Sequence, residues 1–186
     1  TITNVTLSGN SATDYGGGMY LSGSNPTITN VTLSGNTTNI HGGGMCMGNS
    51  SLTLTNSILW DNSPQEIFFY ETGVPNSITI TYSDIQGGQD SIATNDNGTV
   101  TWGNGNIDID PMFVDATDGN YHLLASSQLI NAGHPDSLDS DGSRADIGAY
   151  PYLNSYSGPT WYISESGNDT TATGAGGDPF RSIQAG

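Results

Sequence analysis

Residues 1–10 read TITNVTLSGN, and residues 27–36 read the same ten letters. The two copies are 26 positions apart (27 − 1 = 26), and degenerate copies begin at Leu52 and Ile78 in the same register. The triplet Gly16-Gly17-Gly18 also recurs at the same distance, as Gly42-Gly43-Gly44. An identity of this length without drift in its spacing indicates a structural repeat of one fixed size.

The composition of the repeat favours strands and turns. Helical solenoid repeats are longer, at ~33 to 47 residues, and are rich in Ala, Leu, Glu and Lys. This unit consists mainly of Thr, Ile, Val, Asn, Ser and Gly, and its apolar residues lie two apart, as do Val5 and Leu7 or Ile78 and Ile80. Such alternation is typical of short strands. The sequence therefore predicts an all-β, single-stranded parallel β-helix with coils of ~26 residues, in which each coil hydrogen-bonds to the next.

The alternation predicts which side chains fill the interior of the coils. We expect a column of apolar side chains inside, and Thr side chains on the outer surface. Cys46 aligns with Tyr20 one coil earlier and is expected to be exposed. The expected interior residues are Ile2, Val5, Leu7, Met19, Leu21, Ile28, Val31, Leu33, Met45, Met47, Leu54, Ile58 or Leu59, Ile67, Phe69, Ile80 and Ile85; the expected outer residues are Thr3, Thr6, Thr29, Thr32, Thr53 and Thr55.

Three asparagines, Asn4, Asn30 and Asn56, are each 26 residues apart. Asn tolerates the left-handed backbone conformation needed where a strand bends. A side-chain amide can also donate to and accept from the same amide one coil away. We therefore expect these residues to form a ladder that faces the interior.

Two kinds of motif carry a family resemblance. The pattern Leu-x-x-Asn (Leu7 to Asn10, and again Leu33 to Asn36 and Leu59 to Asn62), with Gly-Gly-Gly-Met, resembles the repeats of polymorphic-outer-membrane-type proteins. The later motifs at 110–115, 120–123, 130–133 and 141–150 are similar to tails of secreted bacterial proteins of the pectin-lyase-like superfamily. The resemblance implies a right-handed β-helix and a bacterial protein that is extracellular or on the cell surface. It says little about function, because this superfamily contains lyases, hydrolases, epimerases and adhesins.

The same resemblance suggests a domain order. Residues 1–150 are expected to be the C-terminal coils of one β-helix followed by an irregular terminal segment. Residues 151–160 contain Pro, Gly and Ser and are interpreted as a linker. Residues 161–186 are similar to the opening of another β-helix module, which would be incomplete here. The stretch is thus interpreted as an excerpt of a longer protein.

Charge excludes several kinds of partner. The chain has a formal net charge of −16 and only two basic residues, Arg144 and Arg181. A protein of this kind cannot neutralise phosphates, so binding to nucleic acid or to anionic lipid surfaces is not expected. No apolar run approaches the ~20 residues that cross a bilayer, so no membrane insertion is expected in this stretch.

The sequence predicts no catalytic residue and no cofactor-binding residue in this stretch. Polysaccharide lyases of this superfamily use a basic residue, whereas residues 1–104 contain neither Arg nor Lys. Asp61 and Asp84 are 23 residues apart and hence are not simply stacked as a hydrolytic pair. His41 precedes a Gly triplet at the position that Tyr15 occupies one coil earlier, and this exchange is typical of an aromatic residue on a turn.

One acidic cluster resembles a calcium loop. The cluster has the alternating spacing of Ca²⁺ ligands and consists of Asp136, Asp139 and Asp141, with Asp146 nearby. Ca²⁺ is therefore a candidate cofactor, although none is required by the fold. The alternative is a terminal turn held by Asp side chains and by pairing of Arg144 with an Asp.

Outward-facing aromatic residues are candidate contacts for sugars, namely Tyr20, Trp60, Phe68 and Tyr70. The leading hypothesis is a non-catalytic, secreted or cell-surface module for adhesion, with polysaccharides or cell-surface glycans as partners. Two alternatives remain open: the stretch belongs to a polysaccharide-active lyase or hydrolase whose catalytic coils lie outside it, or it is a structural spacer.

Overall fold

The computed structural model describes residues 1–153, 164–167 and 177. The chain divides into two compact units, Thr1–Asn154 and Ser155–Gly186, and only the first is described further. Most of the predicted linker at 151–160, and most of the second module predicted for 161–186, lie outside the described residues.

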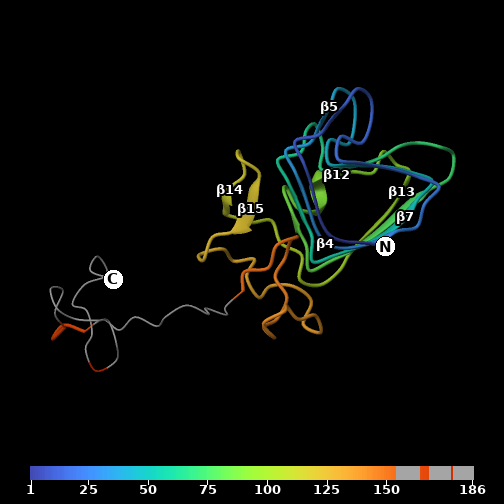
Figure 1. Cartoon of the computed structure of the whole chain (residues 1–186). Helices are drawn as coiled ribbons and strands as arrows, with labels where there is room; N and C mark the ends of the chain where they lie inside the picture. The colour runs from blue at the N-terminus through green and yellow to red at the C-terminus, as the bar shows by residue number, and fades with distance from the viewer. Residues whose placement is uncertain (154–163, 168–176, 178–186) are drawn as a thin grey trace. The chain divides into compact units, whose positions relative to one another are not determined.

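The first unit is a stack of about four coils built from parallel strands (Figure 1). One sheet pairs equivalent strands of successive coils, and a second sheet does the same on another side. A third, two-stranded sheet joins the turns of the first two coils. The first sheet contains β1 (Ile2–Ser8), β4 (Thr27–Ser34), β7 (Ser51–Thr55), β8 (Ile58–Trp60), β10 (Asn76–Thr81), β11 (Asp84–Ile85) and β13 (Gly98–Trp102); the second contains β3 (Met19–Ser22), β6 (Met45–Gly48), β9 (Ile67–Phe69) and β12 (Ile92–Ala93); the third pairs β2 (Ser11–Ala12) with β5 (Thr37–Thr38).

Strand register confirms the repeat. Ile2 pairs with Ile28, and Leu33 pairs with Leu59, so each coil advances by 26 residues along β1, β4 and β8. The second sheet departs from this period, because Cys46 pairs with Phe68, only 22 residues later (68 − 46 = 22). The turn before β9 is shorter than its counterparts, while the strands on either side stay paired.

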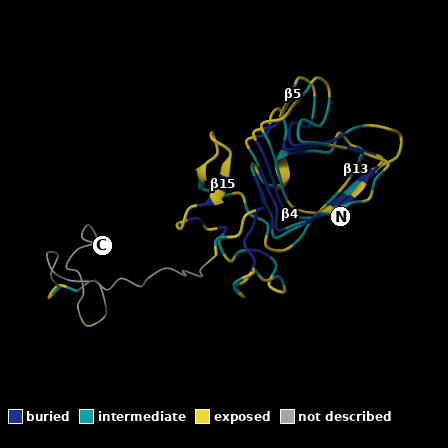
Figure 2. Ribbon diagram, in the orientation of Figure 1, coloured by how far each residue is buried: buried dark blue, intermediate teal, exposed yellow. Residues whose placement is uncertain are grey.

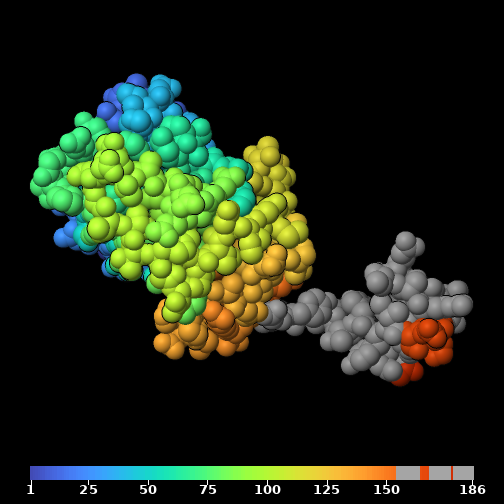
Figure 3. Space-filling view, turned by 180° about the vertical axis from the view of Figure 1, so that it is seen from behind, coloured from blue at the N-terminus to red at the C-terminus, as the bar shows by residue number. Residues whose placement is uncertain are grey.

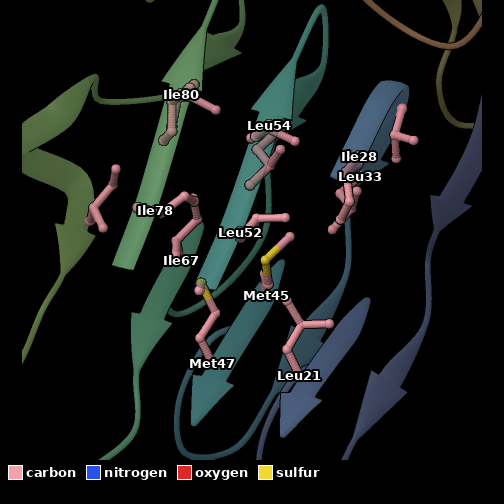
Figure 4. Close-up of a cluster of buried hydrophobic side chains, with 14 of the residues drawn as sticks. Leu21, Ile28, Leu33, Met45, Met47, Leu52, Leu54, Ile67, Ile78 and Ile80 are labelled. Carbon is pink, nitrogen blue, oxygen red and sulfur yellow. The ribbon is translucent and has the colours of Figure 1, made fainter. Parts of the chain in front are cut away.

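Apolar side chains stack inside the coils as predicted (Figure 4), and the buried residues lie along the paired strands (Figure 2). Leu33, Met45, Leu54 and Ile80 are fully buried in this column. The first coil is only partly covered, since β1 and β3 each pair on one side within the described residues. Burial of this apolar surface, at ~25 cal/mol per Å², is the main stabilising contribution to a solenoid.

A C-terminal segment, yellow to orange in Figure 3, packs against the coils, and it covers the outer surface of the first sheet at Ile58. It includes the antiparallel hairpin of β14 (Phe113–Asp115) and β15 (Asn120–Leu123). Ile147 and Leu129 pack on Ile58, and the backbone N–H of Ala149 donates to the Thr32 hydroxyl at 3.1 Å. The prediction that Thr32 is exposed was therefore wrong: its side chain faces outward, but a segment 117 residues away in sequence covers it.

The bend asparagines have the predicted backbone but a different environment. Asn4, Asn30 and Asn56 have φ angles of 56°, 53° and 50°, in the left-handed region. The Asn30 amide donates to Oδ1 of Asn4 at 3.1 Å. The prediction that they face the interior was wrong, because Asn4 and Asn30 line an outer hollow of about 240 Å³ beside the C-terminal segment. Asn56 is buried, and its Oδ1 accepts from the backbone N–H of His134.

A second set of asparagines forms the buried ladder. Oδ1 of Asn36 accepts from the amide of Asn10 at 3.0 Å, and Oδ1 of Asn62 accepts from the amide of Asn36 at 2.8 Å. The Asn62 amide then donates to Glu66 at 2.6 Å. Asn36 and Asn62 thereby satisfy polar groups that would be costly to bury unpaired.

Candidate functional site

Five aromatic rings from three successive coils meet at one edge of the second sheet. Tyr20 and Phe68 lie in one outward column on β3 and β9, with Cys46 of β6 between them. Tyr15 and His41 are bridge partners on neighbouring turns. Tyr70 directly follows β9. We call these five residues the aromatic cluster: Tyr15, Tyr20, His41, Phe68 and Tyr70.

The rings of the cluster contact one another. The His41 ring stacks on Phe68 with centroids 4.0 Å apart and planes 4° from parallel. Tyr15 lies 4.8 Å from Tyr70 and 6.5 Å from Tyr20, between centroids. Such contacts stabilise aromatic pairs beyond the burial of their surface. The cluster is therefore an ordered surface with several ring faces in fixed positions.

Two residues of this outward column, Cys46 and Phe68, were predicted to be exposed but are buried. Cys46 and Phe68 both face outward as predicted, but Cys46 is 0 % exposed and Phe68 is 7 % exposed. His41 covers Phe68 by stacking on it. Burial raises the pKa of the Cys46 thiol to about 11, so this group is an inert, apolar part of the packing.

The accessible part of the cluster borders a shallow hollow of about 320 Å³. Tyr15 and Tyr20 form its aromatic side, and Thr13 and Asp14 form its polar rim. Tyr20 is 48 % exposed. A hydrogen bond with the Tyr70 hydroxyl, together with partial burial, raises the pKa of Tyr15, so its phenol stays neutral at physiological pH. The hollow thus offers neutral ring faces beside an acceptor carboxylate.

Three of the four predicted sugar contacts come together in the cluster, namely Tyr20, Phe68 and Tyr70. The fourth, Trp60, lies elsewhere. Trp60 borders a separate groove with Asp61, Asp110 and Phe113. Sequence reasoning missed Tyr15 and His41 as members of the cluster. Their 26-residue spacing was the available signal, because equivalent turn positions must stack in a β-helix.

Two carboxyl groups have pKa values far above the ordinary range. Burial raises the pKa of Glu66 to about 7 and that of Asp84 to about 7. Glu66 holds Asn62, and Asp84 accepts from the backbone N–H of Ile109 at 3.1 Å. Asp84 is 0 % exposed, whereas Asp61 is exposed. The two aspartates do not form a common site, and the arrangement shows a structural role for Asp84.

The acidic residues of the C-terminal segment hold a turn. Oδ1 of Asp141 accepts from the N–H and the hydroxyl of Ser143, and Oδ2 of Asp139 accepts from the N–H of Asp146 at 3.1 Å. Arg144 donates to the carbonyl oxygen of Gly133 and lies over the Tyr82 ring. Across residues 1–153, 164–167 and 177, no three His, Cys, Asp or Glu side chains are placed to hold one metal ion.

We expect millimolar Ca²⁺ to leave the thermal unfolding midpoint of the protein unchanged. Asp139 and Asp141 already use oxygens to accept from the backbone, and Asp136 lies outside these bonds. Thermal unfolding followed by circular dichroism, with Mg²⁺ as the control cation, measures this. A midpoint that rises with Ca²⁺ and not with Mg²⁺, and no longer rises in Asp136→Asn, would instead assign a site to Asp136, Asp139 and Asp141.

These features define a β-solenoid of the parallel, single-stranded class. The family model for the right handed beta helix region matches residues 1–123 of the 186 residues. The chain belongs to this family, which also gives the coil its right hand. Comparison with curated proteins and with solved structures found no match. Within the described residues, no helix has the length and apolar character required to span a membrane.

Proposed function

We propose that the coils form a non-catalytic carbohydrate-binding module that acts outside the cell, in adhesion or glycan contact. The aromatic cluster supports this proposal, because sugar rings present C–H groups that pack on the electron-rich faces of Tyr and Trp. Tyr20 and Tyr15 offer such faces beside a hollow, and Thr13 and Asp14 at its rim can hydrogen-bond to hydroxyl groups. A few polar groups around apolar rings are typical of small-ligand sites.

The described carboxyl groups favour binding over catalysis in this part of the chain. A general acid with a pKa near 7 would suit hydrolysis, and Glu66 and Asp84 have such values. However, Glu66 is 4 % exposed and Asp84 is 0 % exposed, so neither reaches a substrate. The two carboxyl groups with pKa values near 7 are therefore buried away from the accessible ring faces of the cluster.

Binding of the full chain to a glycan array tests the proposal. We expect Tyr20→Ala and Tyr15→Ala to weaken binding of the recognised glycan by roughly tenfold or more, because each removes a stacking face of a small site. Tyr150→Ala is the matched control, since Tyr150 is an exposed aromatic residue that stacks on His122 outside the cluster. Thermal unfolding of each variant shows whether its fold is intact.

Two outcomes contradict the proposal. One is an array on which the folded chain binds no glycan. The other is binding that neither Tyr15→Ala nor Tyr20→Ala changes. The first outcome would favour the structural spacer, and the second would move the site away from the cluster.

A further inference from the structure

The groove beside Trp60 has its own chemistry. It has a volume of about 390 Å³ and lies between the end of β8 and the hairpin segment. Trp60, Phe113 and Leu124 supply its apolar surface, and Asp61 and Asp110 supply two carboxylates. Leu124 is 41 % exposed. An aromatic ring with carboxylates around it is a combination that attracts cations.

Local hydrogen bonds hold both carboxylates at the groove. Asp61 and Met112 have φ angles of 58° and 57°, in the left-handed region that non-glycine residues seldom adopt. Oδ1 of Asp61 accepts from the side-chain amide of Gln86 at 3.4 Å, and Oδ1 of Asp110 accepts from the N–H of Met112 at 2.8 Å. Each carboxylate is thus anchored on one side while its residue remains exposed.

The described part of the chain supplies no cation to this groove. Arg144 is its one Lys or Arg residue, and it donates to the carbonyl oxygens of Gly133 and Ala132 while it lies 5.8 Å from the centre of the Tyr82 ring. The formal net charge of −16 adds a long-range field that attracts positive ligands and repels uronates. Within the described residues no Lys or Arg side chain pairs with Asp61 or Asp110, so a bound cation would meet two carboxylates without a basic partner.

We propose that the Trp60 groove binds a saccharide that carries a free primary amine. The ammonium group pairs with Asp61 and Asp110, and the sugar ring packs on the indole of Trp60. A rigid sugar ring suits this open groove better than a flexible side chain, whose ordering costs more entropy. This site is separate from the aromatic cluster, which carries no such pair of carboxylates on its ring faces.

Titration calorimetry of the full chain with the disaccharide of glucosamine tests this site. We expect binding that weakens roughly tenfold in Asp61→Asn and in Asp110→Asn, because each loses a charge-assisted hydrogen bond. Both asparagines keep the Oδ1 acceptor, and Asn tolerates the left-handed backbone at 61, so these variants should fold. The N,N′-diacetylated disaccharide should bind about tenfold more weakly than the free amine.

Two controls separate specific recognition from general attraction to an acidic protein. Asp115→Asn and Asp118→Asn remove the same charge from the exposed hairpin turn and should leave the affinity unchanged. Tyr20→Ala should also leave it unchanged, so failure here is distinguishable from failure of the aromatic cluster. The proposal is overturned if the acetylated sugar binds equally well, or if all four aspartate variants weaken binding to the same extent.

Discussion

Replacing Leu33 by Asp should lower the free energy of unfolding by roughly 4 kcal/mol or more. Leu33 is 0 % exposed and pairs with Leu7 on one side and with Leu59 on the other. The new carboxylate would be surrounded by apolar side chains of three coils, with no cation to pair with. Because whole domains are stable by only ~5–15 kcal/mol, much of the protein should unfold. Urea denaturation followed by circular dichroism measures the loss.

Thr53→Asp provides the matched control. Thr53 is exposed on β7, between the buried residues Leu52 and Leu54. The same charge at this site should cost less than ~1 kcal/mol, since it only replaces a residue with higher strand propensity. A loss under ~0.5 kcal/mol for Leu33→Asp would mean that Leu33 does not lie inside the coil.

Asp84→Asn should stabilise the protein at pH 8 by about 2 kcal/mol or more. Burial raises the pKa of Asp84 from 3.8 to about 7, so ionising this carboxyl costs about 4 kcal/mol more in the folded protein than in the unfolded chain. An amide removes this charge and keeps the Oδ1 that accepts from Ile109. Part of this gain is lost because the amide N–H₂ of Asn would take the place of Oδ2 of Asp84. Oδ2 has no hydrogen-bond partner, so the buried N–H₂ would lack one too.

The same carboxyl group gives stability a defined pH dependence. Because the folded pKa is raised, the stabilisation is fully present below pH ~4 and is lost as the pH rises to about 7. Urea midpoints of the parent protein should therefore fall over this window, with a further contribution from Glu66, whose pKa is also about 7. Asp84→Asn should flatten the profile, and Asp118→Asn, which removes an exposed charge that is not among those acting on Asp84, should not. A parent midpoint that rises from pH 5 to pH 8 would contradict this account.

The interior of the coils was predictable because it depends on local alternation. Leu33, Met45 and Leu54 could be assigned from the repeat alone, since identical residues one period apart must meet in a β-helix. Burial of outward side chains was not predictable in the same way. Thr32 and Ile58 are covered by the segment around Ile147, and no periodic signal links residues so distant in sequence.

The candidate site was partly predictable for a related reason. Tyr20, Phe68 and Tyr70 were identified as outward aromatic residues, but 26-residue spacing alone does not place Phe68 below Cys46. The turn before β9 is four residues shorter, so the pairing of Cys46 with Phe68 required the structure. Trp60 keeps the regular spacing and still lies apart from the cluster, because it belongs to β8 of the first sheet and not to the second sheet.

The amide chain from Asn10 through Asn36 to Asn62 has a direction, and Glu66 gives it an end. Each amide N–H₂ donates toward the C-terminal coils, so every rung needs an oxygen after it. Both carboxyl oxygens of Glu66 accept from Asn62, and Glu66 has no amide that could donate to a further rung. Evolution could therefore lengthen this protein by duplicating units before Asn62, whereas a copy inserted after Glu66 would have to begin a new chain of amides.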